Sequence, residues 1–125
     1  MSQIYRHRFA LPDKVIGRID LESGDVYETR IGPDKRIGRV DFQSGKIYRR
    51  LLGPDNYIGQ VDLESGRIYL EHLGPDEYIG RVTEAGKLYR HVPLGRDDYV
   101  GKVVGDALIV AGGAAFLLFF AAEID

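Results

Sequence analysis

Residues 57–69 read YIGQVDLESGRIY, and this stretch recurs with small changes along most of the chain. Its first part is an Ile-Gly or Val-Gly pair followed by a polar residue, and it recurs every 21 residues, at positions 16, 37, 58, 79 and 100. Its last part is Ile-Tyr or a close variant, at residues 4–5, 26–27, 47–48, 68–69 and 88–89. A fixed period of this kind indicates a repeat architecture.

Both parts have the composition of short β-strands, because they are rich in β-branched and aromatic residues and are bounded by turn residues. One connection ends in a glycine (Gly24, Gly45, Gly66 and Gly86), which supplies the positive φ that a tight hairpin turn needs. The other connection carries Gly-Pro-Asp at 32–34, 53–55 and 74–76, which is also turn chemistry. The pattern predicts a meander of ten short strands.

The two ends of the repeat region suggest how the strands are arranged. The region starts with a second part, Ile4-Tyr5, and its last copy is a first part, Val100-Gly101-Lys102. An open stack would leave both as bare edges, whereas a ring would pair them. We therefore predict an all-β fold, a closed rotational array of 21-residue β-hairpin repeats with four full hairpins and two terminal half-units. A short open solenoid capped by the C-terminal segment is the alternative.

A glycine inside every predicted first strand is unusual, because glycine weakens a strand and packs nothing. Its recurrence indicates a steric reason. We expect an aromatic ring from the neighbouring Ile-Tyr strand to lie across it.

The C-terminal segment has a different composition. Residues 107–122 read ALIVAGGAAFLLFFAA, in which 14 of 16 residues are apolar. A helix that is apolar all round lies in a membrane or inside a protein, and this one is short for a membrane span. We expect residues 1–104 to form the repeat domain and residues 105–125 to add an apolar helix to the same domain, packed on or in the ring.

Two alternatives for this segment stay open. It could instead join copies into a homo-oligomer or anchor the protein in a membrane. The residues expected to make such contacts are Leu108, Ile109, Phe116, Leu117, Phe119 and Phe120. Residues 103–109 also read as two strands around a Gly-Asp turn, in which case the helix would begin only near Gly112.

Composition excludes several classes of function. The chain has 125 residues, no cysteine and a net charge of −2. Disulfides, thiol nucleophiles and cysteine-ligated metals are thereby excluded, and the expected basic footprint of a nucleic-acid-binding protein is missing. No cofactor motif is recognisable. A cytoplasmic location is expected, with membrane association as the alternative.

Repeated polar residues are the candidates for ligand binding. A ring of cations would be formed by Arg18, Arg39, Arg81 and Lys102, but Asp20, Asp41 and Asp62 stand two residues after three of these positions and are expected to neutralise it. The repeated tyrosines Tyr27, Tyr48, Tyr69 and Tyr89 could form aromatic cages for choline-like or sugar ligands, or could replace a missing core. His7, His72 and His91 are interpreted as surface residues and not as metal ligands.

No nucleophile, base and orienting group recur together, so the function expected is that of a non-enzymatic structural or protein-interaction module. Two other hypotheses are kept. One is a membrane-tethered adaptor anchored by the C-terminal segment, and the other is a multivalent binder of anions, sugars or choline-like ligands.

The unit at residues 57–69, repeated four times and followed by an Ala- and Leu-rich C-terminus, resembles the four-fold β-flower family of small bacterial proteins. The resemblance implies β-hairpins that radiate like petals, and it implies no activity or binding residue. That family has four petals, so the question it raises is whether the terminal half-units here form a fifth.

Overall fold

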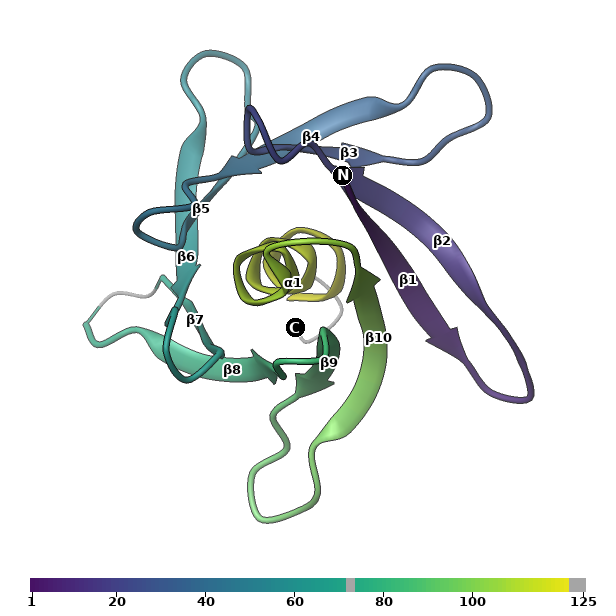
Figure 1. The fold of residues 1–125 in the computed structure, drawn as a ribbon. Helices are drawn as coiled ribbons and strands as arrows, with labels where there is room; N and C mark the ends of the chain where they lie inside the picture. Colours follow the sequence, from purple (N-terminus) through teal and green to yellow (C-terminus); the bar gives the residue numbers. More distant parts are fainter. Residues whose placement is uncertain (72–73, 122–125) are drawn as a thin grey trace.

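The chain forms ten antiparallel strands that close into a barrel around its own C-terminal helix (Figure 1). The computed structural model describes residues 1–71 and 74–121. The elements are β1 (Ser2–Arg8), β2 (Leu11–Ile19), β3 (Asp25–Glu28), β4 (Lys35–Val40), β5 (Lys46–Arg49), β6 (Asn56–Val61), β7 (Arg67–Leu70), β8 (Glu77–Val82), β9 (Lys87–Arg90), β10 (Asp98–Val104), the α-helix α1 (Leu108–Ala115) and the π-helix η1 (Phe116–Phe120).

The first and last strands close the barrel. In the pairing of β1 with β10, Ile4 lies opposite Val103 and Tyr5 lies opposite Lys102. The predicted closed array is therefore confirmed, and the open solenoid is wrong. The two terminal half-units complete a fifth repeat, so the barrel has one repeat more than the four petals that the β-flower resemblance implies.

The two kinds of connection lie at opposite ends of the barrel, because neighbouring strands are antiparallel. At the turn end, each turn glycine has a positive φ, for example 81° at Gly24. At the other end, the hairpins β1–β2, β3–β4, β5–β6, β7–β8 and β9–β10 extend beyond the barrel wall, and we call them the arms. Figure 1 shows the arms radiating around the central helix.

A β-bulge at the base of every arm accompanies this outward course. In the β3–β4 pair, Val26 faces Gly38 and Tyr27 faces Arg36, so Ile37 is the extra residue. The same shift occurs at Ile16, Ile58, Ile79 and Val100. Bulges bend a strand and increase its twist, which helps a sheet curve into a closed barrel. The Ile-Gly pair is therefore a bulge position.

Two rings of aliphatic side chains line the interior nearest the turn end. Each member is at most 3% exposed. The even-numbered strands contribute Ile19, Val40, Val61, Val82 and Val103, and the odd-numbered strands contribute Ile4, Val26, Ile47, Ile68 and Leu88.

Helix α1 fits inside these rings because its residues there are small. Ala111, Ala114 and Ala115 are fully buried. A Cβ atom on Gly112 would overlap Val82, and one on Gly113 would overlap Val61. Alanine and glycine therefore set the closest approach between helix and barrel.

The five strand glycines form the next ring, and η1 fills the space that they leave. Each of five consecutive η1 residues packs against a different repeat. The pairs are Phe116 with Gly80, Leu117 with Gly59, Leu118 with Gly38, Phe119 with Gly17 and Phe120 with Gly101. The order steps around the barrel one repeat at a time, through β8, β6, β4, β2 and β10. The expectation that tyrosine rings cover these glycines is therefore wrong, because the covering side chains come from the C-terminal helix.

A π-helix suits this arrangement. An α-helix turns by about 100° per residue, which exceeds the roughly 72° between neighbouring members of a five-fold ring. The wider turn of an i→i+5 helix rotates less per residue and keeps closer to the repeats. The backbone N–H of Ala121 donates to the carbonyl of Phe116, which is the i→i+5 spacing.

The helix begins at Leu108, preceded by Ala107 in the left-handed conformation (φ 53°). The alternative of an extra strand at residues 107–110 is therefore wrong. No helix within the described residues is both long enough and apolar enough to cross a bilayer.

Candidate functional site

The sequence-predicted cations and tyrosines lie together on the outside of the barrel. Arg18 faces Tyr27 across the β2–β3 pair, and Arg39 faces Tyr48 across β4–β5. The guanidinium carbon lies 4.1 Å and 3.9 Å from the respective ring centroids, which is cation–π stacking. The same contact joins Arg81 to Tyr89 at 4.2 Å and Lys102 to Tyr5 at 5.4 Å. Tyr69 faces Gln60, which replaces the cation in the remaining repeat.

Aspartates of the arms neutralise these cations. Arg18 Nε lies 3.0 Å from Asp34, Arg39 Nε 3.1 Å from Asp55 and Arg81 Nε 3.1 Å from Asp97. Lys102 Nζ lies 3.7 Å from Asp13, so the series closes around the barrel. Each cation is thus held between a tyrosine ring and a carboxylate. We call this series the outer belt.

The expected partners of these cations were different. Asp20, Asp41 and Asp62 instead cap the turns at the other end, where the carboxylate of Asp20 accepts from the backbone N–H of Glu22 at 2.9 Å. The same bond recurs at Asp41 and Asp62, and the N–H groups of Gln43 and Glu64 lower the pKa of these two carboxyls. The prediction that they neutralise the cation ring is therefore wrong.

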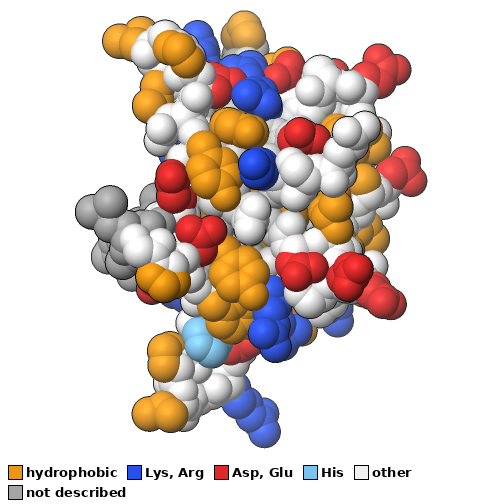
Figure 2. Space-filling model, turned by 90° about the vertical axis from the view of Figure 1, so that its left-hand side faces the viewer, with side chains coloured by type: hydrophobic (Ala, Val, Ile, Leu, Met, Phe, Trp, Pro, Cys, Tyr) orange, Lys and Arg blue, Asp and Glu red, His pale blue; other side chains and the backbone are white. Residues whose placement is uncertain are grey.

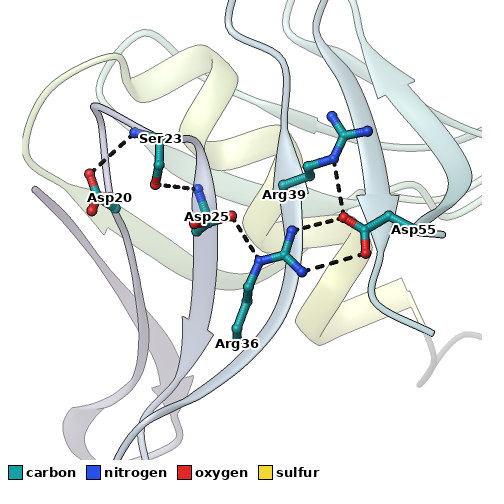
Figure 3. A network of polar contacts seen from close by, with 6 residues as sticks. All are labelled: Asp20, Ser23, Asp25, Arg36, Arg39 and Asp55. Atoms are coloured by element: carbon teal, nitrogen blue, oxygen red, sulfur yellow. Dashed lines mark hydrogen bonds and ion pairs between the residues drawn. The ribbon is translucent and has the colours of Figure 1, made fainter. Parts of the chain in front are cut away.

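The densest part of the outer belt surrounds Arg36 (Figure 3). Its guanidinium donates to Asp25 at 2.8 Å and to Asp55 at 2.8 Å, while Asp55 also accepts from Arg39. The hydrogen bond from Arg36 is the main cause that lowers the pKa of Asp55, although partial burial acts in the opposite direction. Charge is balanced inside this cluster, which therefore acts as a clamp between neighbouring arms.

The tyrosines stack on one another as well as on cations. Ring centroids are 5.8 Å apart for Tyr48 and Tyr57, 5.9 Å for Tyr69 and Tyr78, and 5.6 Å for Tyr89 and Tyr99. Burial raises the pKa of Tyr57. The rings line the outer face, so they do not substitute for the core, which the aliphatic rings of the barrel and the C-terminal helix form together.

Two histidines lie at the bases of arms. His7 Nδ1 is 3.4 Å from Asp13 and His91 Nδ1 is 3.3 Å from Asp97. His72 lies outside the described residues. Across the described ranges no three His, Cys, Asp or Glu side chains converge as a metal site would require.

The residues predicted for assembly or membrane contact line the barrel interior. Phe116, Leu117 and Phe120 are fully buried, and Leu108, Ile109 and Phe119 are partly buried against the same core. Arg49 Nη2 donates to the carbonyl of Leu117 at 3.4 Å, and Arg6 lies 5.0 Å over the ring of Phe120. These contacts hold the C-terminal helix in its own barrel.

Sequence reasoning missed the arm tips. Four apolar side chains there are almost wholly exposed: Phe9 (93%), Ile31 (107%), Leu52 (105%) and Leu94 (109%). Ile31, Leu52 and Leu94 fall on the 21-residue grid, and the grid position between the last two, Leu73, lies outside the described residues. We call the exposed tip residues the arm rim. The sequence does carry a signal for these exposed residues: an apolar residue recurs immediately before Gly32 and Gly53, the glycines of the arm loops.

Open pockets flank the arms. One, of about 390 Å³, is lined by Lys35, Arg36, Ile37, Arg49, Arg50, Leu51 and Leu52. A second, of about 330 Å³, is lined by Arg6, Lys14, Val15, Ile16, Glu28, Thr29, Leu118 and Phe119. The first places basic and apolar side chains beside one another at the base of an arm.

Comparison with known proteins finds no matching family model, no matching curated protein and no matching solved structure.

Proposed function

We propose that this protein is a non-enzymatic interaction module whose arm rim docks on a partner surface. The carrying observation is the near-complete exposure of Phe9, Ile31, Leu52 and Leu94 at arm tips. Single exposed apolar residues are common on protein surfaces. Recurrence at the tips of separate arms is different, because it places apolar groups around one end of the molecule where folding gains nothing from them.

The rest of the molecule fits a scaffold role. The barrel wall and the C-terminal helix fill each other, as the five η1 side chains against five glycines demonstrate. Ion pairs of the outer belt then fix neighbouring arms relative to one another. A rigid frame lowers the entropy cost of presenting several contact points at once.

The other hypotheses gain less support. Cations of the outer belt are engaged by tyrosines and aspartates, so an anion bound there would have to displace a carboxylate. Within the described residues, the C-terminal helix is packed inside its own barrel, which leaves its large side chains little surface for an anchor or for oligomer contacts. With the cysteine-free composition, we place the module in the cytoplasm.

Site-specific photo-cross-linking in cells tests this proposal. A benzophenone amino acid replaces Leu52 at an arm tip, and in the matched control it replaces Leu63 at the turn end, which is 40% exposed. We expect an adduct from position 52, to a protein or to a lipid, and none from position 63. Equal labelling from both positions, or no adduct from position 52 and from position 31, would contradict the proposal.

A further inference from the structure

We propose that the surface on which the arm rim docks is an anionic lipid bilayer. This inference rests on the proposed function and names its partner. Three independent features support it: where the tips lie, how charge is distributed between the two ends of the barrel, and what lines the pocket beside one tip.

The described arm tips lie at one end of the barrel. Every arm loop joins an odd-numbered strand to the following even-numbered strand, so the antiparallel topology places all of these loops at the same end. In Figure 2 apolar side chains project along the left-hand edge of the molecule. A ring of apolar points around one end of the molecule can touch a flat surface together, which is the geometry of shallow insertion into a bilayer interface.

Basic residues accompany the described tips. Arg8 is adjacent to Phe9 and Arg30 to Ile31, while Arg50 and Arg96 lie two residues from Leu52 and Leu94. Arg8 Nε donates to the carbonyl of Pro12 at 2.8 Å and Arg30 Nε lies 3.5 Å from Glu28, so these two side chains would exchange those contacts for lipid phosphates when the apolar side chains enter the interface. The fourth arm differs, since it carries Glu71 where the preceding arm carries Arg50.

The opposite end of the barrel is acidic. Residues 20–25, 41–46, 62–67, 83–87 and 105–106, which form the turn end, contain eight acidic and three basic residues. Figure 2 shows acidic side chains along the right-hand edge, away from the projecting apolar groups. An anionic surface would therefore repel the turn end and attract the arm rim, although the chain as a whole carries a charge of −2.

The pocket beside Leu52 combines both kinds of contact. Its polar lining is entirely basic (Lys35, Arg36, Arg49 and Arg50), and Leu51 and Leu52 form its apolar edge. Arg36 is engaged by two aspartates and Arg49 donates to the carbonyl of Leu117, so Lys35 and Arg50 are the cations that we assign to a headgroup phosphate. A lipid whose phosphate enters this pocket would have its acyl chains beside the two leucines.

A bilayer fits this surface better than a protein partner does. Two copies meeting rim to rim would bring their arginines together, which is repulsive. An asymmetric protein offers no reason for the same apolar and basic pairing on separate arms, whereas a bilayer is equivalent in every direction around the ring.

The backbone at Leu94 adds an independent observation. Leu94 has φ 61°, in the left-handed region that a branched side chain rarely adopts, and it is fully exposed. In the other arm loops the positive φ falls one position later in the repeat, on a glycine such as Gly53 with φ 89°. Neither packing nor backbone conformation favours leucine at this position. This is expected if the Leu94 side chain contacts the surface on which the protein docks.

Vesicle co-sedimentation of the full chain tests the inference. The probes are vesicles of phosphatidylcholine alone and of phosphatidylcholine mixed with phosphatidylglycerol. We expect about tenfold tighter binding to the anionic vesicles, and a loss of that preference when salt is raised. The triple variant Ile31→Ser/Leu52→Ser/Leu94→Ser should bind at least about tenfold more weakly, because it removes three apolar contacts. The triple variant Arg30→Gln/Arg50→Gln/Arg96→Gln should bind both vesicle types with equal affinity.

The matched controls lie at the turn end. Leu63→Ser/Val104→Ser removes two partly exposed apolar side chains, and Lys46→Gln/Arg67→Gln/Lys87→Gln removes three cations. Both should bind anionic vesicles within about twofold of the unaltered chain. The tip side chains are so exposed that replacing them leaves the fold intact, which circular dichroism verifies.

Equal binding to both vesicle types by the unaltered chain, or equal losses in the tip variant and its control, would overturn the inference. A tip-dependent dimer in sedimentation velocity runs would also overturn it. If the unaltered chain shows no preference for anionic vesicles while the cross-linker at position 52 captures a single protein in cells, the lipid inference is wrong and the proposed docking function is retained. If neither a preference for anionic vesicles nor an adduct at position 52 is observed, both proposals are wrong.

Discussion

Phe116 lies against Gly80, where a Cβ atom would come within 2.6 Å of the phenylalanine ring and within 2.6 Å of the carbonyl oxygen of Tyr89. Gly80 therefore leaves a gap in the inner wall of the barrel, and the Phe116 ring of the central helix fills that gap. The same relationship recurs in every repeat with a different η1 residue. The barrel and its central helix consequently share one core.

Gly80→Ala should destabilise the fold by about 1–3 kcal/mol, because the added methyl group must displace the ring or the neighbouring strand. Gly95→Ala is the matched control. A Cβ atom at Gly95 meets only Val92 at 3.3 Å, and its φ is not positive, so little change is expected there. Urea denaturation of both variants measures the difference. Equal stability of the two variants would mean that Phe116 is not tightly packed against Gly80.

Phe116→Ala should lower the free energy of unfolding by about 3–5 kcal/mol, since it empties a fully buried site. Phe9→Ala removes the same side chain from a position that is 93% exposed and should cost less than about 0.5 kcal/mol. Thermal unfolding followed by circular dichroism compares them. A small effect at position 116 would show that the barrel is stable without its central packing.

How far the sequence predicts this fold depends on the element. The 21-residue period, the turn glycines and the terminal half-units predict the strands and their closure, because each has a local signature. The side chains that pack against the strand glycines cannot be predicted in the same way. They depend on how the C-terminal helix is rotated and positioned inside the barrel. The run Phe116 to Phe120 has no helical amphipathicity, and its match to five glycines appears only when the helix stands on the barrel axis.

The candidate site divides similarly. Pairing of Arg39 with Tyr48 follows from strand register, whereas its carboxylate partner, Asp55, comes from a loop whose course the sequence leaves open. The sequence therefore offered Asp41, which is nearer along the chain but caps a turn. The arm tips were overlooked because Ile31 and Leu52, taken singly, resemble ordinary loop residues.

Asp55→Asn should destabilise the protein at neutral pH, because Arg36 and Arg39 both donate to this carboxylate. The folded-state pKa of Asp55 lies below its ordinary value, so its stabilising effect is present above the unfolded pKa of about 3.9 and is lost as the pH falls through the folded pKa. The difference between variant and unaltered chain should therefore shrink in acid. Asp76→Asn is the control, because Gln60 replaces the arginine in that repeat. Urea denaturation at neutral and acidic pH measures both, and a pH-independent difference at position 55 would contradict the ion-pair assignment.

Leu94→Gly should stabilise the fold by about 1 kcal/mol, because glycine adopts a positive φ without the steric cost that leucine incurs at 61°. Ile31→Gly is the matched control, since Ile31 is equally exposed but has no positive φ. Glycine there only increases the freedom of the unfolded chain, so that variant should be slightly less stable. Opposite shifts in melting temperature are the expected result. Because both variants also remove a rim side chain, Leu94→Gly should gain stability while it loses vesicle binding, which would separate the role of leucine at the arm rim from any role in folding. A Leu94→Gly protein that melts lower than the unaltered chain would mean that Leu94 stabilises its own arm, and the argument from its strained backbone would no longer hold.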